Sequence, residues 1–273
     1  MFEISEEYLD DYKGACVVIK CGGETLEDAA ALDNVTDQIL FLAKHGIKLA
    51  LVHGGGGQIK ERAEQRGIQE TKQDGVRVTC DATLSVAAEV LEELNGKLVS
   101  IFKDKIKADA SLHGLEVNGF GASEFITAEQ VPALGLVGEP SAVKSDFIMR
   151  KLMSGIAVIH PICADDKGQL LNVNADSVGG AIGRAINAKR VVFCTSMPGV
   201  LDKQKQLISS LDPQAIYDLI ADGTITDGMV KKIKECEALL GSVEGVAIVG
   251  SAQEDSILHE LLGEGAGTLI CAA

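Results

Sequence analysis

Four consecutive glycines, Gly54 to Gly57, form the strongest chemical signal in the sequence. They follow an apolar run that ends at Val52, and a stretch with helical spacing begins at Gln58. Glycines at this point free the backbone to direct N–H groups at an anion, beside the positive end of a helix. The run therefore indicates a site for a phosphoryl group, and a merely flexible turn is the alternative.

The glycine run matches neither of the common nucleotide-binding fingerprints. A P-loop needs Gly-Lys-Ser/Thr after a four-residue gap, and the dinucleotide pattern needs a third glycine where Ile59 stands. The acidic residue that binds a ribose is also not correctly placed after any glycine turn. A dehydrogenase is therefore a weaker hypothesis than phosphate chemistry.

A second glycine turn brings a cation. Lys20 and the pair Gly22-Gly23 follow the apolar residues Val17 to Ile19. Ligands of open α/β sheets bind at the carboxyl ends of strands, where this ammonium would lie. A lone lysine there is more often a solvated strand end. Because two glycine turns are expected in the same sheet, we interpret Lys20 as a functional group.

Three polar residues, Asn172, Asn174 and Asp176, alternate with apolar residues. On a strand they would share one face, so the pattern predicts a surface lined by three hydrogen-bonding side chains. The alternative is an exposed strand followed by a helix with Asp176 as its N-cap.

A second functional lysine is expected on the helix predicted at Gly228 to Leu240. Lys232 lies roughly 70° from the centre of that helix's apolar stripe, if each residue turns the helix by about 100°. Lys231 and Lys234 are expected to point toward solvent, so only Lys232 is expected to reach inward. The stripe consists of Met229, Ile233, Cys236 and Leu240.

Arg77 lies in an expected turn before a long helix. A guanidinium in this setting suits bidentate binding of a carboxylate, although a lone arginine is more often a surface residue. None of the five histidines has a partner at the spacing of a metal site or a nucleophile relay. The sequence therefore assigns no residue directly to a metal.

The elements that position these residues alternate between strands and helices. Unbroken apolar runs predict strands at Ala15 to Ile19, Lys48 to Val52, Ile156 to His160, Arg190 to Cys194, Val243 to Val249 and Thr268 to Cys271. Helical spacing covers Leu26 to His45, Gly57 to Arg66, Ala82 to Ile106, Ser177 to Ala188, Pro213 to Ala221, Gly228 to Leu240 and Glu254 to Leu262. We therefore predict an α/β fold, a three-layer αβα sandwich with a central, mostly parallel sheet. The irregular segment from Val117 to Val143 reads as hairpins or loops that cover a substrate.

Composition limits the partners. The chain has a formal net charge of −15, which argues against nucleic acid and against an anionic membrane surface. Seven cysteines, an odd number without a Cys-x-x-Cys pair, favour free and mostly buried thiols in a reducing compartment. The sequence shows neither a signal-peptide pattern nor a long apolar stretch, so we expect a cytoplasmic protein.

Taken together, the segments from Ala15 to Ile270 resemble the amino-acid kinase family. The match is carried by the order of Val-Ile-Lys-Cys-Gly-Gly, His-Gly-Gly-Gly, Gly-Val-Arg-Val-Thr, Gly-Leu-Val-Gly-Glu, Leu-Asn-Val-Asn-Ala-Asp, Pro-Gly-Val-Leu-Asp, Thr-Asp-Gly-Met-x-x-Lys and Gly-Ala-Gly-Thr. The resemblance implies a carbamate kinase-like fold and the use of ATP with Mg²⁺. It also implies phosphorylation of the side-chain carboxylate of N-acetyl-L-glutamate to an acyl phosphate, a step of arginine biosynthesis.

The resemblance also implies roles for individual residues. Lys20 and Lys232 would be catalytic lysines that neutralise the transferring phosphoryl group, and Asp176 would hold both in place. The acyl amino acid would be bound by Gly55, Gly56, Arg77 and Asn172. ATP and its phosphates would be bound by Gly22, Gly23, Gly54, Thr195, Ser196, Gly199, Asp202 and Met229. Such a transfer needs positioning and charge stabilisation but no general base, because a carboxylate is ionised at neutral pH.

The same resemblance implies one kinase domain over residues 1–273. An N-terminal lobe of about residues 1–173 would bind the acyl amino acid, and a C-terminal lobe of about residues 174–273 would bind ATP. The spacing of Ile4, Tyr8 and Tyr12 predicts a short N-terminal helix, either loosely docked or in an oligomer contact. It is similar to the helix that joins dimers into hexamers in arginine-inhibited relatives. We expect a homodimer or a higher oligomer.

Two alternatives stay open. The first is a kinase of the same family that acts on a different carboxylate, such as a carrier-linked aminoadipate, since the loop around Ala122-Ser123-Glu124 lacks the usual Asp-Gly. The second is a catalytically silent regulator that binds an amino acid or a nucleotide, because Thr195-Ser196-Met197-Pro198 stands where the family usually has an aspartate. The presence of Lys20, Asp176 and Lys232 favours the enzyme.

Overall fold

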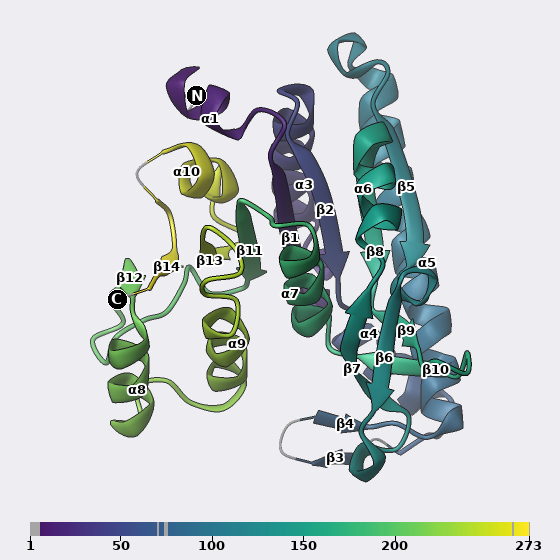
Figure 1. Ribbon diagram of the computed structural model, residues 1–273. Helices are drawn as coiled ribbons and strands as arrows, with labels where there is room; N and C mark the ends of the chain where they lie inside the picture. The colour runs from purple at the N-terminus through teal and green to yellow at the C-terminus, as the bar shows by residue number, and fades with distance from the viewer. Residues whose placement is uncertain (1–5, 70, 74–75, 264, 273) are drawn as a thin grey trace.

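The structure is a computed structural model that describes residues 6–69, 71–73, 76–263 and 265–272. Its described strands form an eight-stranded central sheet in the order β12-β14-β13-β11-β1-β2-β8-β5 (Figure 1). The six strands from β13 to β5 are parallel, and β14 is antiparallel to β13. The bounds are β1 Cys16–Cys21, β2 Lys48–His53, β5 Glu116–Gly121, β8 Gly155–His160, β11 Arg190–Thr195, β12 Ser210–Leu211, β13 Val246–Gly250 and β14 Thr268–Ile270.

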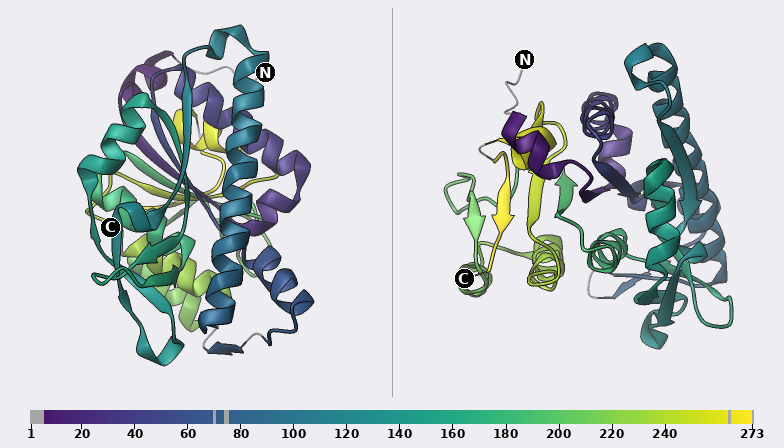
Figure 2. Two further views of the ribbon diagram at one scale, coloured as in Figure 1. Left: turned by 90° about the vertical axis from the view of Figure 1, so that its right-hand side faces the viewer. Right: turned by 45° about the horizontal axis from the view of Figure 1, so that its top comes forward.

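Helices cover both faces of this sheet, as Figure 2 shows. On one face the core includes residues of α3 (Ala29–Lys44), α5 (Asp81–Ala108) and α10 (Ser256–Leu262). On the other face it includes residues of α6 (Ser145–Ser154), α7 (Ala175–Ala185), α8 (Pro213–Ala221) and α9 (Asp227–Glu237). The three-layer αβα prediction is therefore confirmed, and α6 is a helix that the sequence pattern did not reveal.

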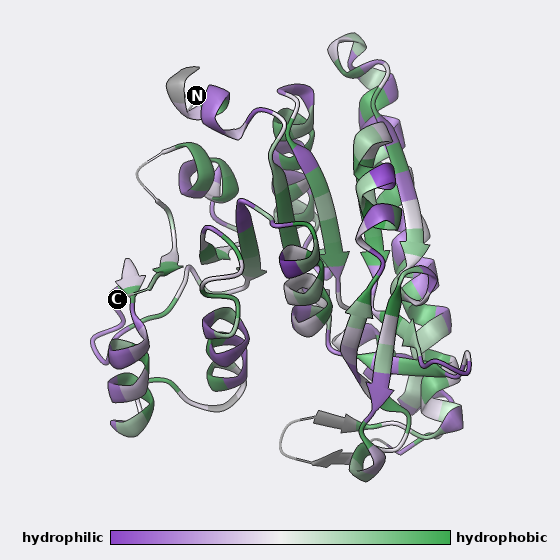
Figure 3. Cartoon of the chain, viewed as in Figure 1, coloured by the Kyte–Doolittle hydropathy of each residue, from purple (hydrophilic) through white to green (hydrophobic). Residues whose placement is uncertain are grey.

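Two-sided burial explains why the central strands are apolar without interruption. All six residues of β1 are buried. Val17 and Ile19 belong to the core cluster on one face, and Val18 belongs to the cluster on the other, because successive side chains of a strand point to opposite sides. Figure 3 shows the corresponding hydrophobic colouring along the middle strands.

The remaining helices are short or peripheral. They are α1 (Glu6–Tyr12), α2 (Gly23–Glu27) and α4 (Gly56–Gln65). Asp28 ends α2 and begins α3, where its carboxylate accepts hydrogen bonds from the N–H groups of Ala30 and Ala31. The single helix expected at Leu26 to His45 is therefore split at this cap. In the described residues, no helix is both long and apolar enough to cross a membrane.

The segment from Val117 to Val143 is only partly the hairpin that the sequence predicts. Strands β6 (Ile126–Gln130) and β7 (Val137–Val143) do form an antiparallel hairpin, which closes a small barrel with β9 (Ile162–Ala164) and β10 (Leu170–Val173). The first part, β5, is instead an edge strand of the central sheet and pairs with β8. Two glycines hide its strand pattern, and at Gly119 the side chains of Asn95 and Val99 fill the place of a Cβ.

A separate two-stranded sheet consists of β3 (Thr71–Gln73) and β4 (Val76–Val78). It lies between α4 and α5 in the chain. Arg77 is on β4, but its side chain lies outside the described part of the structure. The predicted contact of Arg77 with a carboxylate therefore stays a prediction.

Candidate active site

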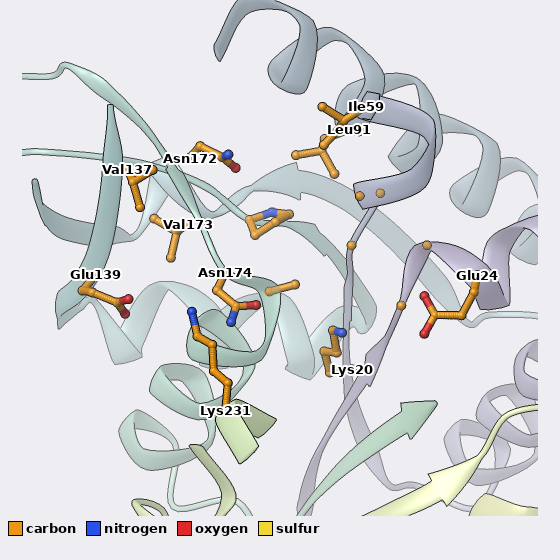
Figure 4. Close-up of a pocket in the computed structure, with 17 residues that line it drawn as sticks. Lys20, Glu24, Ile59, Leu91, Val137, Glu139, Asn172, Val173, Asn174 and Lys231 are labelled. Atoms are coloured by element: carbon orange, nitrogen blue, oxygen red, sulfur yellow. The ribbon is translucent and has the colours of Figure 1, made fainter. Parts of the chain in front are cut away.

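Two glycine turns and the end of β10 enclose a pocket of about 350 Å³ at the carboxyl ends of β1 and β2 (Figure 4). Its lining combines backbone groups, polar side chains and a small apolar wall formed by Ile59, Leu91 and Val137. Of the predicted site residues, the pocket is lined by Lys20, Gly22, Gly23, Gly54, Gly55, Gly56 and Asn172.

The two glycine turns are in direct contact. Gly54 N–H donates to the carbonyl of Cys21 at 2.9 Å, and the Gln58 side-chain amide donates to the carbonyl of Gly23 at 2.9 Å. A Cβ on Gly23 would lie 3.2 Å from both Gly55 Cα and Gly56 N. A side chain at Gly23 would displace Gln58 Oε1, 2.6 Å from such a Cβ, and push the turns apart by a few tenths of an ångström, so packing favours glycine here. Gly55 is also the N-cap of α4, and this places the positive end of that helix at the pocket.

Asp176 binds two ammonium groups. Its Oδ1 lies 2.8 Å from Lys20 Nζ, and its Oδ2 lies 2.8 Å from Lys232 Nζ. Lys20 comes from β1, Asp176 from the first turn of α7, and Lys232 from α9. The inward direction predicted for Lys232 is therefore confirmed by geometry.

Lys20 and Asp176 stay ionised although they are buried. Burial acts to lower the pKa of Lys20, but the charge and hydrogen bond of Asp176 and the charge of Glu24 outweigh it and raise that pKa above its ordinary value. Burial acts to raise the pKa of Asp176, and the two lysines outweigh it and lower the pKa to about 2. Within this cluster two ammonium groups face one carboxylate, so the cluster itself carries one net positive charge, and this charge suits an anionic ligand.

The shared strand face predicted for Asn172, Asn174 and Asp176 is wrong. Strand β10 ends at Val173, and Asn174 is the N-cap of α7, with its side-chain oxygen accepting a hydrogen bond from Asp176 N–H at 3.1 Å. The suggested N-cap role of Asp176 is also wrong, because that position belongs to Asn174. Asparagine is among the strongest N-cap residues, and it starts the helix two residues before Asp176. Asn172 and Asn174 still line the same pocket.

Lys231 is a pocket residue, although the helical pattern placed it in solvent. It lines the pocket with Lys20, whereas Lys234 on the same helix is exposed (Figure 4). A helical wheel gives the direction of Cα–Cβ only, and the four-carbon chain of lysine can extend along the surface from there. The carboxylates of Glu24 and Glu139 also line the pocket and were not predicted.

His53 is a second residue that the sequence analysis missed. Its ring is fully buried, with Nδ1 3.1 Å from the carbonyl of Gly54 and Nε2 3.2 Å from the side-chain amide of Asn95. Burial lowers the pKa of His53 to about 4, so the ring is neutral at pH 7. A neutral ring that donates from Nδ1 and accepts at Nε2 satisfies both contacts and holds the start of the glycine turn. Its position before the glycine run was visible in the sequence, but its partner was not.

The predicted nucleotide residues of the C-terminal half lie outside the lining of this pocket. Thr195 ends β11, which pairs in parallel with β1, so it lies at the same edge of the sheet as Lys20. Its hydroxyl donates to the Met197 carbonyl at 2.8 Å, and the Asp202 carboxylate accepts two backbone N–H bonds within its own loop. The contacts predicted for Thr195, Ser196, Gly199, Asp202 and Met229 with a nucleotide stay predictions.

Comparison with known proteins identifies the family of the chain. Residues 15–249 match the model of the amino acid kinase family. The chain belongs to the amino acid kinase family. It is 38% identical over 275 residues to an acetylglutamate kinase of Methylobacterium nodulans, with 96% of this chain and 90% of that protein covered. It is 37% identical to an acetylglutamate kinase of Nitratidesulfovibrio vulgaris, with 96% of this chain and 89% of that protein covered.

Solved structures share the fold of this amino acid kinase. An N-acetylglutamate synthase from Neisseria gonorrhoeae superposes with a TM-score of 0.82 at 21% identity, and the match covers 97% of this chain but 61% of the synthase. A carbamate kinase from Giardia lamblia superposes with a TM-score of 0.70 at 13% identity, covering 95% of this chain and 99% of that one. The carbamate kinase-like fold predicted from the sequence is therefore confirmed.

Proposed function

We propose that this chain transfers the γ-phosphoryl group of ATP to the side-chain carboxylate of N-acetyl-L-glutamate and forms an acyl phosphate, as in arginine biosynthesis. The arrangement of Asp176 between Lys20 and Lys232, next to a glycine-lined pocket, carries this proposal. Relatives at 34–38% identity over nearly the whole chain bear the name acetylglutamate kinase. The identity of the acceptor is inferred from these relatives, and the transfer of a phosphoryl group is inferred from the geometry of the site.

Each group in the pocket has a part in the transfer. Backbone N–H groups of the two glycine turns orient the phosphoryl group, and Lys20 and Lys232 stabilise the negative charge on it in the transition state. Asp176 positions both lysines without taking part in proton transfer. The attacking carboxylate is already ionised at neutral pH, so the reaction needs no base from the protein.

ATP enters with Mg²⁺ in this proposal. A protein usually holds Mg²⁺ through one or two carboxylates together with the substrate phosphates, and Glu24 in the pocket is an oxygen ligand of this kind. The bound ion would neutralise phosphate charge. The protein's own contribution is a fixed set of amides and ammonium groups.

The two substrates are assigned to different halves of the molecule. The acyl amino acid occupies the lobe of about residues 1–173, where Ile59, Leu91 and Val137 offer an apolar wall and Asn172 a polar group. Arg77 and the backbone of Gly55 and Gly56 bind its polar ends. The nucleotide occupies the lobe of about residues 174–273, with Thr195, Ser196, Gly199, Asp202 and Met229 beside it.

An acceptor panel tests the proposed function. Purified chain is incubated with Mg-ATP and with N-acetylglutamate, glutamate, N-acetylaspartate or an aminoadipate derivative, and ADP release is followed while acyl phosphate is trapped as a hydroxamate. We expect turnover with N-acetylglutamate and its loss by orders of magnitude in Lys20→Ala and Lys232→Ala. Turnover with another acid but not with N-acetylglutamate would show that the proposed acceptor is wrong. An absence of turnover with every acid would favour a catalytically silent regulator.

The proposed enzyme is a cytoplasmic homodimer or a higher oligomer. Helix α1 is fixed to the body of the chain, because Lys189 Nζ lies 2.7 Å from Asp11 and 4.9 Å from the centre of the Tyr12 ring. Tyr8 on the same helix is 50% exposed and provides a surface for a second copy. Light scattering at micromolar concentration should give at least twice the chain mass, and a monomer would contradict this part of the proposal.

A further inference from the structure

Lys231 brings a third lysine into the pocket. It comes from the first turns of α9, next to Lys232, and Figure 4 shows its amino group pointing into the pocket beside Asn174. Lys231 is only partly exposed, whereas Lys234 on the same helix is exposed. The Lys231 side chain therefore extends along the pocket wall, where an anionic ligand can contact its amino group.

The charge of Lys231 is compensated differently from that of its neighbours. Lys20 and Lys232 share the carboxylate of Asp176 at 2.8 Å each. No carboxylate of the described side chains forms a salt bridge with Lys231. Glu139 is close enough for Lys231 to act on its charge, but burial of Glu139 and the nearby charge of Glu235 act against its ionised form. The ammonium of Lys231 is thus the cation of this pocket that is most available to a ligand.

The position of Lys231 distinguishes the two ends of the pocket. Two of the apolar lining residues, Ile59 on α4 and Leu91 on α5, lie at one end of the pocket, and Lys231 lies at the other end, on the side of Val137 and Glu139 (Figure 4). Helix α9 belongs to the part of the molecule that also contains α8, β12 and β14, away from α5 (Figure 1).

We propose that Lys231 binds the phosphates of ATP that are not transferred, through a charge-assisted hydrogen bond. This role depends on the kinase function proposed above. The phosphoryl group in transit lies between the glycine turns and Lys20, and the acceptor's hydrocarbon chain lies against Ile59 and Leu91. The remaining phosphates then extend toward α9, where Lys231 is the nearest cation.

The carboxylate of the acceptor is the competing partner of Lys231. The acceptor is assigned to the lobe of about residues 1–173, whereas Lys231 lies on α9 in the other lobe. A nucleotide phosphate fits this position, because Lys231 and Lys232 are adjacent on one helix and Lys232 already faces the transfer site. Geometry therefore favours the nucleotide.

Three variants of the full-length chain test the role of Lys231. Lys231→Gln keeps the length of the side chain but removes its charge, Lys231→Arg keeps the charge, and Lys234→Gln removes a charge from the same helix outside the pocket. Lys231→Gln should raise the KM for Mg-ATP about ten-fold, because a charge-assisted hydrogen bond is lost. The KM for N-acetylglutamate should change less than about two-fold. Lys231→Arg should recover most of the loss, and Lys234→Gln should behave as the wild type.

Two results would overturn this assignment. One is an unchanged KM for Mg-ATP in Lys231→Gln, and the other is a rise in the acceptor's KM instead. Titration calorimetry with a non-hydrolysable imido analogue of Mg-ATP separates this assignment from the choice of acceptor. If the wild type binds the analogue but does not phosphorylate N-acetylglutamate, the acceptor is wrong. The affinity of Lys231→Gln for the analogue still decides the role of Lys231 in that case. A reduction of about ten-fold supports the role, and an unchanged affinity contradicts it.

Discussion

Asp176 is the residue on which the site depends. It holds Lys20 and Lys232 at 2.8 Å each and is nearly fully buried. A buried ion pair is weak evidence for stability, because the desolvation of the charges offsets most of their attraction. The group is better explained by phosphoryl transfer, which needs fixed positive charge that does not have to reorganise during the reaction.

Replacing Asp176 should damage both stability and turnover. Asp176→Asn leaves the buried Lys20 and the partly buried Lys232 without a counter-charge, so the free energy of unfolding should fall by about 3 kcal/mol. Turnover should fall at least about a hundred-fold, because the lysines lose their positions. Urea unfolding and ADP release measure the two effects. Asp222→Asn, at the exposed pair with Lys203, is the control and should leave both quantities near the wild-type values.

The same carboxylate contributes to the pH dependence of stability. The pKa of Asp176 is about 2 in the folded chain and near its ordinary value of 3.8 in the unfolded chain. A lowered pKa stabilises the fold above the unfolded value, and this contribution is lost as pH falls from about 4 to about 2. The stability difference between wild type and Asp176→Asn should therefore be constant from pH 5 to pH 8 and shrink below pH 4. A difference that persists at pH 2 would contradict the ionised state of Asp176.

At the scale of elements, two strand-to-helix turns must touch to form the pocket. β1 leads into α2 through Gly22 and Gly23, and β2 leads into α4 through Gly54 and Gly55. β1 and β2 are parallel neighbours in register, with Cys21 opposite His53, so both turns leave the sheet at the same level. The register of the sheet places both turns at the same position along the strands, and the absence of a side chain at Gly23 allows their backbones to come into contact.

Adding one methyl group at this contact should separate the turns. In Gly23→Ala the Cβ would lie 2.6 Å from Gln58 Oε1 and 3.2 Å from the backbone of Gly55 and Gly56, so the Gln58 side chain and, by a few tenths of an ångström, the backbone have to shift. We expect kcat/KM to fall about a hundred-fold with a modest loss of stability. Gly96→Ala is the control, because Gly96 is exposed on α5 with nothing within 4 Å of a Cβ. It should stabilise the chain by about 0.5–1 kcal/mol and leave kcat/KM unchanged, as measured by urea unfolding and steady-state kinetics.

At the scale of the whole molecule, the central sheet joins the halves of the site. β1 lies between β2 and β11, so the strand that carries Lys20 contacts the glycine-run strand on one side and the Thr195 strand on the other. Helix α7 packs against β1 and α9 packs against α7, and this stacking delivers Asp176 and Lys232 to Lys20. One continuous sheet therefore brings a pocket near β2 and a predicted nucleotide region near β11 to the same edge.

The sequence by itself determined the elements whose signals are local. Strands such as β1 and β2 were visible because burial on both faces demands an unbroken apolar run. The glycine turns were visible because close backbone approach requires glycine, and Lys20 stood next to one of them. These features depend on residues adjacent in the chain.

Only the tertiary structure decided which distant groups meet. It showed that β5 completes the sheet, that Asn95 supports His53, that α7 begins at Asn174, and that Lys231 reaches the pocket. In each case the outcome depends on a partner supplied by a remote segment, such as β8 for β5 and the pocket wall for Lys231. Local periodicity cannot encode such partners, because burial and pairing are set by how the elements pack.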